Sequence, residues 1–109
     1  MRFTQHYSGS PVCAPSRCVL LSGKHTGHAE IRDNLEIEPE GQQPISARTV
    51  NLPRLLIAQG YTTAVIGKWD LGFPGSAREP NNQGFDHFFG YNCQCQDYNK
   101  SRLIFIKTV

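Results

Sequence analysis

The sequence has no long apolar run, and none of its apolar stretches approaches the roughly 20 residues that a helix needs to span a bilayer. The segment from Met1 to Tyr7 also lacks the apolar core of a secretory signal peptide. Neither sign of charge is in large excess, since 11 basic and 9 acidic residues leave a net charge of +2, which calls for neither nucleic acid nor an acidic membrane as a partner. No internal repeat is present, and a charged content of 18% is typical of neither a disordered chain nor a coiled coil. The 109 residues therefore predict one small domain.

The spacing of the four cysteines identifies neither a redox compartment nor a metal site. Four residues separate Cys13 from Cys18, and Cys93 and Cys95 form a Cys-x-Cys pair, so neither half has the Cys-x-x-Cys spacing of common zinc sites. A zinc-binding or interaction module built on all four stays open as an alternative. The bland interpretation makes Cys18, Cys93 and Cys95 structural.

Helix-ending and helix-capping residues predict two helices. The first is expected over residues 15–22, with a proline in its first turn and Gly23 as its stop. The second is expected over residues 51–59, with Asn51 as a candidate cap and Gly60 after its last residue. A helix, a glycine and then a strand make an α/β unit.

The remaining segments predict one strand and several loops. Residues 61–66 are rich in β-branched side chains, which favours a short buried strand. Residues 26–48 and 73–84 hold prolines and glycines with weak periodicity and are expected to be irregular. Residues 85–91 form an aromatic cluster that should pack on a core, and residues 103–106 form a short apolar run.

The segment Cys13-Ala14-Pro15-Ser16-Arg17 carries the clearest chemical signal in the chain. It places a reactive thiol just ahead of a predicted helix, with a cation one turn further on, and helix N-termini favour anions. Lys68 follows the predicted strand at its carboxyl end, where open α/β folds place ligands. Taken singly, these residues are equally compatible with a buried thiol, a solvated arginine and a loop cation.

Two ordered motifs resemble signatures of one enzyme family. Residues 13–23 hold the pattern Cys-x-Pro-Ser-Arg followed by Leu-Leu-Ser-Gly, which resembles the first signature of the type I sulfatases. Residues 60–72 hold Gly-Tyr-x-Thr-x-x-Ile-Gly-Lys-Trp-x-Leu-Gly, which resembles their second. The resemblance covers about residues 7–97, and residues 98–109 do not follow the family pattern. It implies an alkaline-phosphatase-like α/β fold with helices packed on a mostly parallel sheet, of which residues 1–109 would be an N-terminal catalytic part, incomplete at both ends.

The resemblance also implies a reaction. Cys13 matches the cysteine that a formylglycine-generating enzyme oxidises to Cα-formylglycine, and Pro15, Ser16 and Arg17 belong to the maturation motif. One hydroxyl of the hydrated aldehyde attacks the sulfur of an aryl or carbohydrate sulfate ester and the alcohol leaves. The second hydroxyl then loses its proton and expels sulfate, which regenerates the aldehyde. Arg17 and Lys68 would hold the anionic oxygens, and a calcium ion bound partly by formylglycine 13 would polarise the sulfate.

Two departures from the family pattern limit what is expected. Asp70 stands where the second signature usually has histidine, so that it either points away, contacts metal or a substrate hydroxyl, or marks a weakened site. The family's other metal ligands have no counterpart in this sequence, which predicts weak or no activity for the chain alone. A phosphatase or phosphonate hydrolase of the same superfamily is the enzymatic alternative. The family implies the periplasm, the cell exterior or the lysosome as the compartment.

Overall fold

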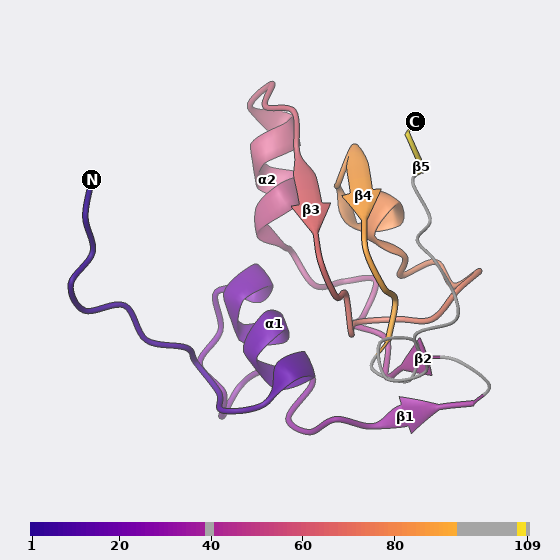
Figure 1. Ribbon diagram of the computed structural model, residues 1–109, viewed down its shortest axis with the longest axis horizontal. Helices are drawn as coiled ribbons and strands as arrows, with labels where there is room; N and C mark the ends of the chain where they lie inside the picture. Colours follow the sequence, from indigo (N-terminus) through magenta and orange to yellow (C-terminus); the bar gives the residue numbers. More distant parts are fainter. Residues whose placement is uncertain (39–40, 94–106, 109) are drawn as a thin grey trace.

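The computed structural model describes residues 1–38, 41–93 and 107–108, which form two helices, a 3-10 helix and two small sheets (Figure 1). The helices are α1 (Cys13–Ser22) and α2 (Leu52–Ala58), and the 3-10 helix is η1 (Pro80–Gln83). One sheet pairs β1 (Glu36–Ile37) with β2 (Gly41–Gln42) in antiparallel fashion. The other holds β3 (Ala64–Ile66), β4 (His87–Phe89) and β5 (Lys107–Thr108) in that order, with β3 and β4 parallel and β5 antiparallel to β4.

Helix α1 begins two residues earlier than the sequence predicts. Ser16 N–H donates to the carbonyl of Val12 at 3.1 Å, so the first helical turn already includes Cys13. Pro15 falls within this first turn, where its missing N–H costs no hydrogen bond. The predicted stop at Gly23 is confirmed, because Gly23 has the left-handed conformation (φ 67°) and its N–H donates to Val19 O.

Helix α2 and strand β3 form the predicted α/β unit, but the strand is less buried than expected. The side chain of Asn51 accepts a hydrogen bond from Arg54 N–H at 3.1 Å, which confirms the predicted cap. Strand β3 covers only three residues, and the expectation that it is buried is wrong, because Ile66 is 80% exposed. The physical reason is that Ala64 and Ile66 point to the same face of the sheet and both are exposed, whereas Val65 on the opposite face packs against the core.

The core lies where α1 meets the segment that follows β3. Its buried members come from both signature segments, from the segment between them and from β4: Ala14, Cys18, Ala29, Ile31, Ile45, Trp69, Leu71 and Phe88. The predicted packing of the aromatic cluster is confirmed for Phe85, whose ring meets that of Trp69 edge-on at a centroid distance of 5.9 Å, and for buried Phe88. Trp69 Nε1–H donates to Arg78 O at 2.8 Å, and this hydrogen bond fixes the orientation of the indole ring. Trp69 stands between Lys68 and Asp70 in the sequence.

The two long segments expected to be loops are largely irregular, with short elements inside them. Residues 26–48 contain the β1–β2 pair, and residues 73–84 contain η1. The apolar run at residues 103–106 and Cys95 lie outside the described residues. In the part of the chain that the structure describes, no helix has the length and apolar character needed to cross a membrane.

Candidate active site

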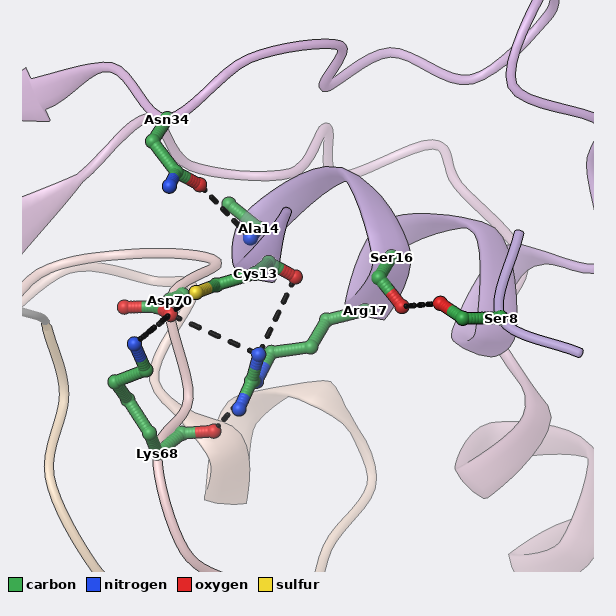
Figure 2. Close-up of polar contacts among 8 residues, drawn as sticks. All are labelled: Ser8, Cys13, Ala14, Ser16, Arg17, Asn34, Lys68 and Asp70. Carbon is green, nitrogen blue, oxygen red and sulfur yellow. Dashed lines mark hydrogen bonds and ion pairs between the residues drawn. The ribbon is translucent and has the colours of Figure 1, made fainter. Parts of the chain in front are cut away.

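Cys13 occupies the first position of α1, and its helix end is capped from another part of the chain. Val12, the residue before the helix, is extended and provides no side-chain cap. Asn34 supplies the missing acceptor instead, because its Oδ1 accepts the Ala14 N–H at 3.0 Å (Figure 2). The half-buried Cys13 side chain therefore lies at the N-terminal end of α1, where the helix dipole favours an anion.

Arg17 joins the two signature segments. Its Nε–H donates to the carbonyl of Lys68 at 2.8 Å, across 51 residues of sequence, and Nη1 donates to the carbonyl of Cys13 at 3.3 Å. The planar guanidinium provides these donors in fixed directions, so α1 is oriented against the end of β3. A third of the Arg17 side chain remains exposed.

Lys68 is the group that faces Cys13. Its Nζ lies 3.3 Å from Cys13 Sγ and 3.1 Å from Asp70 Oδ2, and its side chain is 16% exposed (Figure 2). Partial burial by itself lowers the pKa of Lys68, but the neighbouring Asp70 carboxylate and, to a smaller degree, Cys13 outweigh it, so that this pKa is raised above the ordinary lysine value. Lys68 is thus a persistent positive charge directed at the position of residue 13.

Asp70 is directed into the same cluster and does not point away from it. Its side chain is 1% exposed, and its Oδ2 lies 3.8 Å from Arg17 Nη1 in addition to the contact with Lys68. Its backbone is in the left-handed region (φ 58°) and is fixed by a hydrogen bond from its N–H to Asn92 O at 3.0 Å. Asp70 Oδ1 accepts no hydrogen bond from any described residue.

Pro15 and Ser16, the other members of the predicted maturation motif, lie on α1 away from this cluster. Pro15 is buried. Ser16 shares a hydrogen bond of 2.5 Å with Ser8, and Figure 2 shows it directed toward Ser8, away from Lys68 and Asp70. Neither residue contacts Cys13 Sγ through a hydrogen bond, so the geometry assigns them no part in holding a ligand there.

The residues of this cluster do not fit a calcium ion by themselves. Calcium takes six to eight oxygen ligands, mostly carboxylates and carbonyls. Asp70 is the one carboxylate of the cluster, and two cations already lie against it. Among the described residues, no group of three or more His, Cys, Asp or Glu side chains is placed to hold a metal. The zinc alternative involves Cys95, which lies outside the described residues, and it stays untested.

A cavity of about 420 Å³ opens beside the cluster, between α1 and the end of β3. Arg17, Lys68 and Ser16 form its polar edge, and Cys13 is not among its lining residues. The apolar part of its lining consists of Leu20, Leu21, Val65, Ile66, Trp69 and Phe85. The Cys13 side chain therefore lies outside this cavity.

Comparison with known proteins identifies the family of this chain. Residues 1–105 match the protein-family model described as Sulfatase. The chain belongs to the sulfatase family. Arylsulfatase G of Mus musculus is 39% identical over 90 residues, which are 83% of this chain and 17% of that protein. Steryl-sulfatase of Rattus norvegicus is 34% identical over 101 residues, with the same two coverages.

Solved structures give the same result for the fold of this sulfatase-family chain. The crystal structure of Ps i-CgsB matches with a TM-score of 0.66 and 26% identity, over 86% of this chain and 22% of that chain. Ps i-CgsB in complex with k-i-k-neocarrahexaose also matches with a TM-score of 0.66, and at 23% identity it shows the fold alone. The predicted α/β class and alkaline-phosphatase-like sulfatase fold are thereby confirmed. The sulfatase-family chain spans 17% of the length of the two curated relatives above.

The structure brings Cys13, Arg17, Lys68 and Asp70 together, and it adds the role of Asn34 as the cap of α1, which the sequence did not predict. The acceptor and donor of the Asn34 cap are 20 residues apart in the chain, so no local pattern connects them. The only available signal was Val12, a residue that cannot cap a helix, immediately before a predicted helix.

Proposed function

We propose that this chain carries the nucleophile and one sulfate-binding lysine of a sulfatase that hydrolyses an aryl or carbohydrate sulfate ester. The observation that supports this most directly is the 3.3 Å contact between Cys13 Sγ and Lys68 Nζ, which unites the two signature segments at one helix N-terminus. Family membership gives the reaction class, and the contact gives the position where the ester would sit.

The side chains divide the work of holding the ester. Lys68 binds a sulfate oxygen and balances charge on the oxygen of the leaving group, since its Nζ is already directed at residue 13. Arg17 keeps α1 against the end of β3 through its bonds to two carbonyls, so that residue 13 and Lys68 stay in register. Asn34 fixes the first turn of α1 by accepting the Ala14 N–H.

Formylglycine at position 13 supplies, as its hydrate, one hydroxyl to attack sulfur and a second to release sulfate. The position suits such a group, because a short polar side chain there meets the Lys68 ammonium and is half-exposed to an incoming ester. The partner implied for its formation is a formylglycine-generating enzyme that acts on residues 13–17.

The proposal derives no step through calcium, because the described residues do not form its site. We infer that its remaining ligands lie outside the described residues and that the chain alone has weak or no sulfatase activity. Vigorous release of sulfate from a chromogenic aryl sulfate by the isolated chain would contradict this inference.

The direct test is the mass of the chain after co-expression with a formylglycine-generating enzyme. Conversion of the Cys13 thiol to an aldehyde lowers the mass by about 18 Da. The Cys18→Ala variant, which removes a buried cysteine of the same helix, keeps the loss, and the Cys13→Ala variant abolishes it. Wild-type chain that retains its full thiol mass under these conditions would refute the proposed function.

A further inference from the structure

The buried position of Asp70 is energetically unfavourable for a carboxylate. Its carboxylate is 1% exposed, and a buried charge is costly unless it is paired. Its φ of 58° is also unusual, since Asp70 is the one described non-glycine residue with a positive φ. A glycine or an asparagine would adopt this backbone more readily, so the backbone does not require a carboxylate here.

The two partners of Asp70 are Lys68, which is proposed to bind the substrate, and Arg17, which keeps residue 13 and Lys68 in register. Asp70 Oδ2 lies 3.1 Å from Lys68 Nζ and 3.8 Å from Arg17 Nη1. Because Oδ1 accepts no hydrogen bond from a described residue, no further donor disperses the negative charge. The carboxylate therefore acts on the same space that a substrate anion enters.

The charges of these three side chains add to one positive charge. Arg17 and Lys68 each contribute one positive charge and Asp70 one negative charge. A sulfate monoester carries a single negative charge at neutral pH. A phosphate monoester carries about two, because its second pKa is about 6. Asp70 thus lowers the positive charge that these side chains offer to an anion from two to one, which is a larger loss for a dianion than for a monoanion.

We propose that Asp70 is an internal counter-ion that tunes this site toward monoanionic sulfate esters and against dianionic phosphate esters. The Coulomb repulsion between Asp70 and a bound dianion is twice that with a monoanion at the same place. Asp70 weakens the binding of both anions and weakens the dianion more. The inference rests on the proposed function for the identity of the site, and it assigns the site its substrate charge.

The test measures anion binding by the full 109-residue chain, expressed without the maturation enzyme so that no ester is turned over. The probes are methyl sulfate and methyl phosphate at about pH 8, where the second is a dianion, at constant ionic strength and with a chelator. Binding is followed by chemical-shift titration. The Asp70→Asn variant removes the charge, keeps the shape and tolerates the positive φ.

Asp70→Asn should raise the affinity for both probes. The logarithm of the gain in affinity should be twice as large for methyl phosphate as for methyl sulfate. A gain of about threefold for methyl sulfate would accompany one of about tenfold for methyl phosphate. The matched control is Glu36→Gln, which removes the same charge from an exposed side chain and should leave the ratio of the two affinities unchanged. Asp70→Gly is the second variant, and it should shift the ratio in the same direction.

Three results would overturn the proposal that Asp70 is a counter-ion. They are equal gains in affinity for the two probes, a loss of affinity, or no binding of either probe by both Asp70 variants. The result is separable from that of the proposed function. Conversion of Cys13 together with equal gains refutes the counter-ion alone. A two-to-one ratio of logarithmic gains in a chain whose Cys13 is never converted supports the counter-ion and refutes the formylglycine proposal.

Discussion

Replacing Lys68 with methionine tests the electrostatics of the site through the stability of the fold. Lys68→Met keeps most of the apolar stem and removes the ammonium 3.1 Å from Asp70, which leaves a carboxylate of 1% exposure without its nearest partner. Removing one partner of a buried ion pair costs about 3–5 kcal/mol. Arg17 remains 3.8 Å away and offsets part of this, so we expect about 3 kcal/mol.

The opposite replacement should cost less. Asp70→Asn leaves a lysine that is already 16% exposed and whose flexible stem lets the ammonium turn toward water, so we expect about 1 kcal/mol. In the double variant the buried carboxylate is gone, and the cost should stay near that of Asp70→Asn alone. The coupling energy of the cycle is then about 2–3 kcal/mol.

Urea denaturation followed by Trp69 fluorescence measures these differences. Trp69 is the single tryptophan of the chain, it is 2% exposed, and it lies between the two mutated positions in sequence. If Lys68→Met is too unstable to show a folded baseline, recovery of the baseline in the double variant gives the same information. A Lys68→Met variant as stable as Asp70→Asn, or costs that simply add, would refute the conclusion that Lys68 neutralises a buried carboxylate.

Three further outcomes are expected. Asn34→Ala removes the cap of α1 and should lower the free energy of unfolding by about 1 kcal/mol in urea titrations, whereas Asn34→Asp keeps an acceptor and should not. Because the pKa of Lys68 is raised in the folded chain, its stabilising contribution should be constant below about pH 10.4 and disappear as the pH rises further. The difference in melting temperature between wild type and Lys68→Met, measured from about pH 9 to about pH 11, should therefore shrink only at the alkaline end. Gly90→Ala should cost about 3 kcal/mol, since its Cβ would lie 1.7 Å from the Gly67 carbonyl oxygen, and Gly23→Ala, with open space around it, about 1 kcal/mol on the same denaturation assay.

Local patterns in the sequence were sufficient where local chemistry decides the structure. Gly23 ends α1 and Asn51 caps α2 because a left-handed glycine and a side-chain acceptor act within one turn of the helix. The proximity of Cys13 and Lys68 could also be predicted, because one signature places Cys13 at the start of a helix and the other places Lys68 at the end of a strand. The apolar character of residues 61–66 correctly predicted a strand at Ala64–Ile66.

Features that depend on contacts between segments far apart in the sequence could not be predicted from local patterns. Burial of Ile66 depends on which element covers its face of the sheet, and the sequence of β3 does not contain that information. The Asn34 cap depends on the path of residues 26–34 back to α1. The orientation of Asp70 depends on a left-handed backbone and on the hydrogen bond from its N–H to the distant Asn92 carbonyl, so the sequence left three orientations open.

The two carbonyl bonds of Arg17 have a consequence for motion. They connect the start of α1 to the segment after β3, and such packed elements shift against each other only on microsecond or longer timescales. Side chains that are partly exposed change rotamer in picoseconds to nanoseconds. Residue 13 and the Lys68 backbone should therefore travel as one rigid unit, while the Lys68 ammonium moves quickly between Asp70 and an arriving anion. Arg17 thus makes capture of the anion a side-chain event that requires no rearrangement of the fold.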